Sequence, residues 1–162
     1  MKSDVFFSYA AHDAELAEQL CEPLTAAGAK VFLAHRSVEG GSIWADRLLR
    51  ELDAALCLFF LVTEEACGSA YVQQEIGVAI GLKKPVVPIV ARAFEGELPG
   101  LVQRYQRIDL SAHTPETRLA RLSELGAKVA KRRKLVDTIS DSSLLWLVSK
   151  VVRLDRNPDW LG

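Results

Sequence analysis

The stretch Leu56-Cys-Leu-Phe-Phe-Leu-Val62 decides the fold of this chain, because every one of its positions is apolar. A strand with one solvated face alternates apolar and polar residues, whereas a strand inside a parallel sheet is covered on both faces and reads as an unbroken apolar run. Even when it is extended back to Ala54, the run is too short to cross a bilayer as a helix. We therefore expect a buried strand at the middle of a parallel sheet.

Strand-like and helical segments alternate on both sides of this run. The expected strands cover residues 5–7, 31–33, 56–62, 85–90 and 105–110. The expected helices cover residues 13–28, 43–55, 69–84, 114–134 and 138–154. This alternation predicts an α/β fold of the flavodoxin-like sandwich type, with a parallel five-stranded sheet, helices on both faces and an additional C-terminal helix. We expect residues 1–135 to form the domain and residues 136–162 to be a helical extension packed on it.

Single residues within these segments give further expectations. Asp13 is a candidate N-cap for the first helix, and Pro23 is expected to disturb the same helix. Leu49 and Leu52 belong to the predicted core stripe of the second helix. Pro88 lacks a backbone donor, so an interior strand is expected to lose a ladder hydrogen bond there.

Composition excludes several classes of function. The chain has 162 residues, 49% of them hydrophobic, and a formal net charge of −1, so it is globular and has no overall basic field that would recruit nucleic acid or a membrane. Its three cysteines, Cys21, Cys57 and Cys67, lack metal-ligand spacing and are predicted to be reduced thiols. No secretory signal precedes the first strand. We expect a cytoplasmic protein without a metal or a bound cofactor.

Glu75 is the candidate functional residue. It lies on the helix expected over residues 69–84, and Tyr71 lies one turn before it on the same flank. Ligands of open parallel sheets bind beyond the carboxyl ends of the strands, close to where such a helix begins. Helical geometry by itself favours a solvated boundary residue, however, so the pattern alone leaves a role in chemistry open.

Four segments, taken together, resemble the Toll/interleukin-1 receptor (TIR) domain family over roughly residues 4–110. They are Asp4-Val-Phe-Phe-Ser-Tyr9 with Asp13; Gly28-Ala-Lys-Val-Phe-Leu33 leading to Val38-Glu-Gly-Gly-Ser-Ile-Trp44; Ser69-x-Tyr71-x-x-x-Glu75; and Lys84-Pro-Val-Val-Pro-Ile89. Two positions depart from the family pattern. Tyr71 stands where many members have Trp, and His35-Arg36 stand where many have an acidic residue.

The resemblance implies an activity and a set of site residues. Members of the bacterial NAD-cleaving type break the bond between nicotinamide and ribose with a glutamate at the position of Glu75. The signal-producing TIR proteins of Thoeris anti-phage defence, which this chain resembles, make cyclic ADP-ribose isomers that activate a separate effector. NAD would be the substrate, and TIR–TIR self-association is implied. The implied substrate-binding residues are Phe7, Ser8, Tyr9, His35, Arg36, Trp44 and Tyr71.

Three rival functions remain compatible with parts of the pattern. A TIR adaptor would assemble through homotypic contacts without turnover. A phosphorylation receiver domain shares the fold but needs clustered acids after the first strand, where this chain has Phe7-Ser-Tyr9. A nucleoside glycosyl transferase would use a similar glutamate on another substrate. The basic end of the helix expected over residues 114–134 favours a solvated face over a nucleic-acid site, because no aromatic residues are interleaved with the charges.

Overall fold

The computed structural model describes residues 2–34 and 42–140. Its five strands form one sheet in the order β2-β1-β3-β4-β5, and every neighbouring pair is parallel. The strands are β1 (Val5–Ser8), β2 (Val31–Leu33), β3 (Cys57–Leu61), β4 (Val86–Val90) and β5 (Ile108–Asp109). This is the strand order of a flavodoxin-like sandwich, so the predicted fold class is confirmed.

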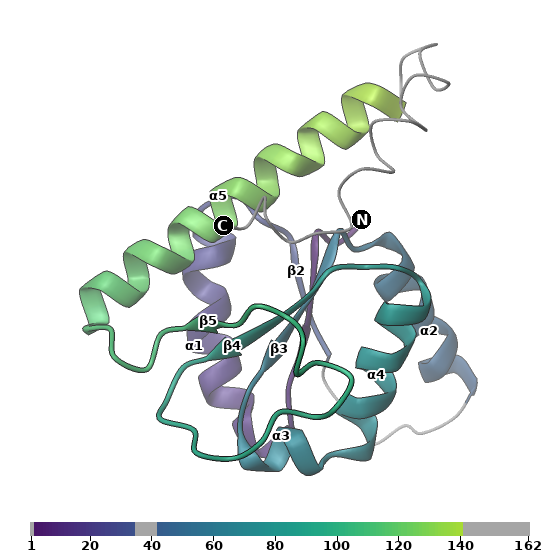
Figure 1. Ribbon diagram of the computed structural model, residues 1–162. Helices are drawn as coiled ribbons and strands as arrows, with labels where there is room; N and C mark the ends of the chain where they lie inside the picture. Colours follow the sequence, from purple (N-terminus) through teal and green to yellow (C-terminus); the bar gives the residue numbers. More distant parts are fainter. Residues whose placement is uncertain (1, 35–41, 141–162) are drawn as a thin grey trace.

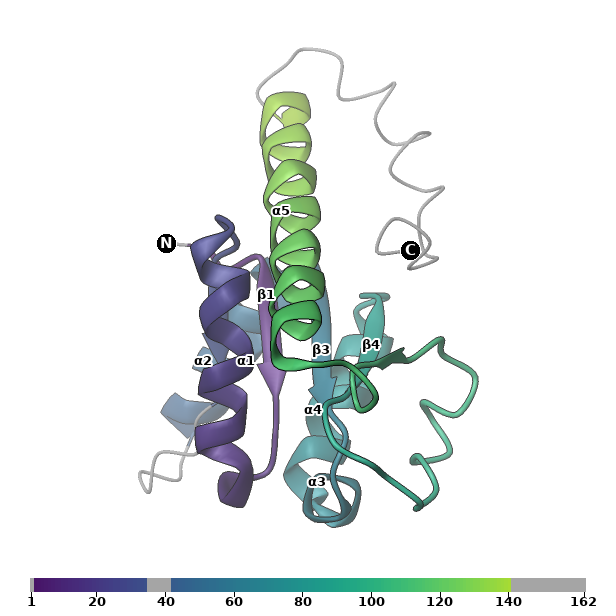
Figure 2. The same cartoon turned by 90° about the vertical axis from the view of Figure 1, so that its left-hand side faces the viewer.

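Helices cover both faces of the sheet (Figures 1 and 2). On one face α1 (Ala14–Ala26), which follows the 3-10 turn η1 (Ala11–Asp13), packs beside α5 (Pro115–Ser140). On the other face lie α2 (Ser42–Ala54), α3 (Glu64–Gly68) and α4 (Ala70–Gly81). Each face has its own hydrophobic cluster, and the sheet separates the two.

Strand β3 is the central strand that its apolar sequence predicts. All five of its residues have no exposed side-chain surface. Phe59 and Leu61 belong to the cluster under α1 and α5, whereas Leu58 and Phe60 belong to the cluster under α4. The strand is apolar throughout because it supplies both cores.

Several boundaries differ from those expected. The helix predicted to end at Lys134 continues to Ser140, because nothing between these residues is a glycine or proline that would stop it. Residues 141–162, which include most of the predicted last helix, lie outside the described part of the chain. The fifth strand is shorter than residues 105–110, and α4 ends at Gly81, after which Lys83 has a positive φ of 60°. Leu49 is 46% exposed and does not belong to the core stripe, whereas Leu52 is buried.

Pro88 lies inside the sheet without loss of a ladder bond. The carbonyls of Pro85 and Ile89 accept from β3, and that of Val90 accepts from β5. Since successive peptide groups alternate sides, the nitrogen of Pro88 faces the side of β5, whose pairing with β4 begins only at Ile89. The predicted loss of a hydrogen bond is therefore wrong, because no partner strand stands opposite this position.

Helix α1 continues through Pro23 to Ala26.

Close packing and one buried ion pair fix α5 against the domain. A Cβ added at Gly126 would lie 2.5 Å from the carbonyl oxygen of Leu24, so only glycine permits this approach of α5 to α1. Further along, Arg133 donates to Asp4 at 2.7 Å and to the carbonyls of Ser3 and Ala54. These contacts lie at the amino ends of the strands, opposite the end where α3 begins (Figure 1).

Strand β2 forms one edge of the sheet, and its three residues are half-buried.

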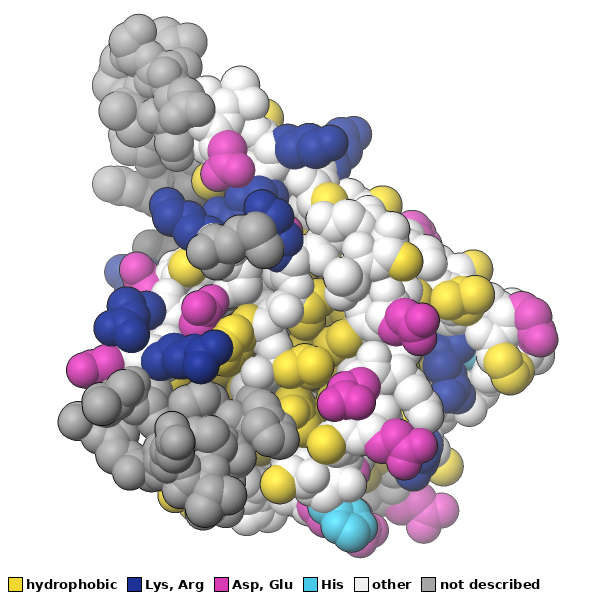
Figure 3. Space-filling model, turned by 180° about the vertical axis from the view of Figure 1, so that it is seen from behind, with side chains coloured by type: hydrophobic (Ala, Val, Ile, Leu, Met, Phe, Trp, Pro, Cys, Tyr) yellow, Lys and Arg dark blue, Asp and Glu magenta, His cyan; other side chains and the backbone are white. Residues whose placement is uncertain are grey.

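Hydrophobic side chains gather near the middle of the face seen from behind (Figure 3). In residues 2–34 and 42–140, no helix combines the length and the low polarity needed to span a membrane.

Candidate active site

The site begins at the point where strand order reverses. Strands β1 and β3 are neighbours, with Ser8 opposite Phe60, yet the chain leaves β1 toward α1 on one face and leaves β3 toward α3 on the other. Diverging connections of this kind leave a crevice beyond the carboxyl ends of the strands, where ligands of such folds bind. The side chains that meet there come from β1 and α4.

Glu75 and Ser8 meet at the carboxyl end of β1. The Ser8 hydroxyl, which is fully buried at the end of β1, donates a hydrogen bond of 2.5 Å to Oε2 of Glu75. Glu75 is 7% exposed, so it is a buried carboxyl and not the solvated boundary residue that helical geometry alone favours.

Burial controls the ionisation of Glu75. Loss of hydration raises the pKa of its carboxyl to about 7, and the hydrogen bond from Ser8 opposes this rise. A carboxyl group with a pKa near neutrality changes charge within the physiological range, which is a property of catalytic groups more than of surface ones. The Glu75 carboxyl can therefore gain or lose its proton near neutral pH, and Ser8 is the described neighbour that favours its charged form.

Two tyrosines flank the Ser8–Glu75 pair. Tyr9 follows Ser8, is buried and packs in the cluster under α1. Burial raises the pKa of its phenol, and the nearby charges of Glu18 and Glu75 add to the rise, so Tyr9 stays neutral at ordinary pH. Tyr71 lies in the first turn of α4 and is 49% exposed, so much of its ring faces solvent one turn before Glu75.

The other expected binding residues are not all brought to the site. The side chain of Phe7 is fully buried on the opposite face of the sheet, where its ring packs against Phe59 with the centroids 6.4 Å apart. Neighbouring residues of a strand point to opposite faces, so the side chains of Phe7 and Ser8 cannot line the same wall. Trp44 begins α2, but its side chain is outside the described part of the chain, as are His35 and Arg36.

A second polar pair at this end of the sheet was not predicted. The Thr63 hydroxyl donates to Oδ2 of Asp13 at 2.6 Å and accepts from the backbone N–H of Ala66 at 3.0 Å. Thr63 thus caps α3, which the sequence analysis missed although Thr followed by two glutamates is a typical helix start. Asp13 holds the N-cap position of α1 without a side-chain capping bond, because its carboxylate is directed to Thr63.

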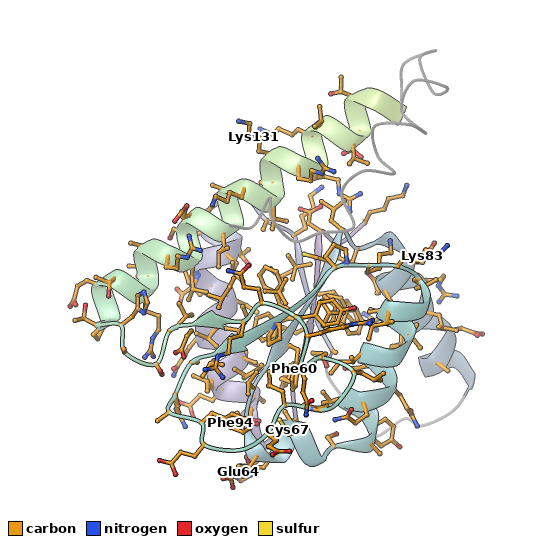
Figure 4. The ribbon with its side chains drawn as sticks, viewed as in Figure 1. Phe60, Glu64, Cys67, Lys83, Phe94 and Lys131 are labelled. Atoms are coloured by element: carbon orange, nitrogen blue, oxygen red, sulfur yellow. The ribbon has the colours of Figure 1, made fainter. Side chains whose placement is uncertain are left out.

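The loop between β4 and β5 packs beside α3. Phe94 of this loop lies near Cys67 in Figure 4, and both residues pack against the cluster that contains Phe60. Glu64, in the first turn of α3, points outward at the same end of the molecule (Figure 4). Phe94 and Cys67 therefore extend the hydrophobic cluster at this end of the sheet.

The described residues contain no cluster of His, Cys, Asp and Glu that could hold a metal ion. All three cysteines are free thiols, as predicted, and burial raises the pKa of the Cys21 thiol to about 12. Cys21 is therefore a neutral core residue.

The fold and the site together define a flavodoxin-like α/β domain with a buried carboxyl group at its topological switch point. The TIR domain family model matches residues 5–124, and the chain belongs to the TIR domain family. None of the curated proteins is significantly similar in sequence.

Two solved structures have the same fold. The TIR domain of the Toll-related receptor TRR-2 from Hydra magnipapillata is 22% identical, with a TM-score of 0.56 over 67% of this chain and 84% of the receptor domain. A TIR-STING receptor from C. gigas, solved in complex with 2′,3′-cGAMP, is 16% identical, with a TM-score of 0.58 over 75% of this chain and 39% of that receptor. This chain therefore corresponds to less than half of the second receptor.

Proposed function

We propose that this TIR domain cleaves the bond between nicotinamide and ribose in NAD, with Glu75 as its catalytic carboxylate. The observation that carries the proposal is that Glu75 is 7% exposed and hydrogen-bonded to Ser8 at the carboxyl end of β1. Burial raises the pKa of this carboxyl group to about 7, and shifts of this kind are typical of functional sites.

The chemistry of NAD suits a single buried carboxylate. The nicotinamide nitrogen is cationic, so the ring departs as a neutral molecule with the electron pair of the broken C–N bond. Positive charge then develops on C1 and the ring oxygen of the ribose, as in glycoside cleavage. A carboxylate beside C1 stabilises a charge that exists only near the transition state, and this lowers the barrier.

The ionisation of Glu75 matches this task. With a pKa of about 7, the carboxyl group is partly protonated in the free protein at neutral pH. A cationic nicotinamide ring close to it favours the charged form, because an opposite charge lowers the pKa of an acid. Binding of NAD would therefore complete the ionisation of the group that the reaction requires.

Tyr71 lies in the first turn of α4, one turn before Glu75. The half-exposed ring of Tyr71 is the candidate surface for stacking on nicotinamide.

We also propose a cyclic ADP-ribose isomer as the product, on the basis of the resemblance to signal-producing TIR proteins. After nicotinamide leaves, an adenine nitrogen or a ribose hydroxyl of the same ADP-ribosyl group would attack C1, and a hydroxyl would lose its proton in this step. Water would otherwise attack and give linear ADP-ribose. In anti-phage defence such a product would activate a separate effector, and self-association or a trigger would start the reaction.

Nicotinamide release from NAD by the purified protein tests the proposal. Glu75→Gln keeps the size of the side chain but removes its charge, and we expect turnover to fall by about 100- to 1000-fold. Glu64→Gln is the matched control, because it neutralises a carboxylate at the same end of the domain outside the crevice. Absence of release by the wild type at any protein concentration, and with phage-infected lysate added, would indicate an adaptor instead.

Chromatography of the reaction products with mass analysis tests the cyclic product. Linear ADP-ribose carries one additional water compared with a cyclic isomer, so the two differ in mass as well as in retention. Linear ADP-ribose alone would contradict the proposal of a cyclase while leaving that of NAD cleavage intact.

A further inference from the structure

The side chain of Asp13 connects the two layers of the fold at the carboxyl end of the sheet. Asp13 directly precedes α1, which covers one face, whereas Thr63 directly precedes α3 on the other face. Their side chains meet at 2.6 Å although they are 50 residues apart in sequence. The two loops that diverge at the crevice are therefore tied together across it.

The Thr63 hydroxyl both donates and accepts a hydrogen bond in this arrangement. Its single proton goes to Oδ2 of Asp13, and the oxygen accepts from the N–H of Ala66 at 3.0 Å. The second contact is part of the first turn of α3, so Asp13 is linked to the start of a helix and not to a mobile side chain. A carboxylate that accepts a hydroxyl proton makes a stronger hydrogen bond than a neutral acceptor does.

The pair lies next to the site in both segments of the chain. Asp13 is five residues after Ser8 and ends the turn η1. Thr63 begins the segment that continues through α3 directly into α4, where Glu75 lies. The Asp13–Thr63 bond therefore spans the same two segments as the Ser8–Glu75 bond.

We propose that Asp13 and Thr63 are positioning residues, which hold the loop after β1 against the α3–α4 segment and so keep the Ser8 hydroxyl on the Glu75 carboxylate. This inference rests on the proposed function of Glu75 but assigns no contact with substrate to either residue. A displacement of about 1 Å at a reacting centre can reduce a rate about 100-fold. Loss of the pair therefore acts on turnover more than on substrate binding.

Substitutions at Asp13 separate positioning from simple stabilisation of α1. Asp13→Ala removes the hydrogen bond to Thr63 but no capping bond, because the Asp13 side chain makes none. Asp13→Asn keeps an oxygen that can accept from Thr63 and removes only the charge, which otherwise favours the helix N-terminus. A role of the Asp13 charge at the helix N-terminus predicts the same effect for both variants, whereas positioning predicts that Asp13→Asn retains most of the activity.

Thr63 provides an independent test from the other side of the bond. Thr63→Ser keeps the hydroxyl and is expected to behave as the wild type, whereas Thr63→Val keeps the shape and removes the bond. Thr25→Val is a matched control, because the Thr25 hydroxyl bonds only to the Cys21 carbonyl within α1. These variants also keep the proposal testable if Asp13→Ala does not fold.

Two measurements are made on each variant. The first is nicotinamide release, from which we expect kcat to fall about 10-fold or more in Asp13→Ala and Thr63→Val, with KM changed by less than about threefold. The second is the titration of the Glu75 side-chain carboxyl by carbon NMR, which requires no enzymatic activity. A loosened bond from Ser8 should move its midpoint upward in the same two variants.

The two measurements distinguish the possible failures. An unchanged Glu75 titration and an unchanged kcat in Asp13→Ala would overturn the positioning role, even if the melting temperature fell. Equal losses in Asp13→Asn and Asp13→Ala would overturn it as well. A protein that does not cleave NAD but shows the expected titration shifts would refute the proposed function and leave the positioning role supported.

Discussion

Replacement of Ser8 by alanine should shift the pH dependence of NAD cleavage without abolishing the reaction. Ser8 is fully buried, and its hydroxyl is the described group that favours the charged form of Glu75, at 2.5 Å from Oε2. Alanine at this position removes the donor, and no water can easily replace it in a buried strand. The hydrogen bond that opposes the rise in the pKa of Glu75 on burial would then be lost.

The size of the shift follows from the strength of such a bond. A hydrogen bond to a charged group contributes about 1.5–3 kcal/mol, and one pKa unit corresponds to about 1.4 kcal/mol, so the pKa of Glu75 should rise by about one to two units. From its value of about 7, it would reach about 8 to 9 in Ser8→Ala. At pH 7 the ionised fraction would fall from about one half to between about one tenth and one hundredth.

The assay is kcat/KM for nicotinamide release between pH 5 and 10, because this parameter reports ionisations of the free enzyme. The wild type should lose activity as the pH falls through about 7, whereas Ser8→Ala should lose it at higher pH. At pH 7 the variant should be about 5- to 50-fold slower, and most of the difference should disappear near pH 10.

A control at Ser69 distinguishes this effect from general damage to α4. The Ser69 hydroxyl accepts from the N–H of Val72 and caps the helix that carries Glu75, so Ser69→Ala should destabilise the protein by about 1 kcal/mol. Ser69→Ala should not change the pH at which kcat/KM falls on the acid side of the profile. A uniform loss of activity in Ser8→Ala at every pH, with the pH of this fall unchanged from the wild type, would refute the reasoning.

Three further predictions concern stability. The pKa of Glu75 is higher in the folded chain, at about 7, than its ordinary value of 4.5, so the native state binds more protons between these values and stability falls as the pH rises through them. Glu75→Gln should therefore be more stable than the wild type at pH 8, by up to about 3 kcal/mol, and equally stable near pH 4; urea unfolding at both values tests this. Gly126→Ala places a Cβ 2.5 Å from the Leu24 carbonyl and should lower the melting temperature, and an unchanged value would show that α5 can move away without loss. Arg133→Met leaves the 1% exposed Asp4 carboxylate without its cation and should cost about 3–5 kcal/mol in chemical unfolding; a loss below 1 kcal/mol would contradict the importance of this pair.

Local patterns in the sequence were sufficient for the central strand and for the alternation of helices and strands. The apolar run around Phe59 indicates a strand that is buried on both faces. The residues next to Ser69 are sufficient to identify it as the start of a helix. These features depend on residues a few positions apart, so periodicity and capping rules can detect them. The same rules could have predicted α3 from Thr63.

Only the tertiary structure decided which distant side chains meet. The bond between Ser8 and Glu75 joins residues 67 positions apart, and it depends on the register of β1 against β3 and on the way α4 packs over both. Burial, and with it the raised pKa of Glu75, is a property of the assembled layers, because no residue is removed from water by its sequence neighbours alone.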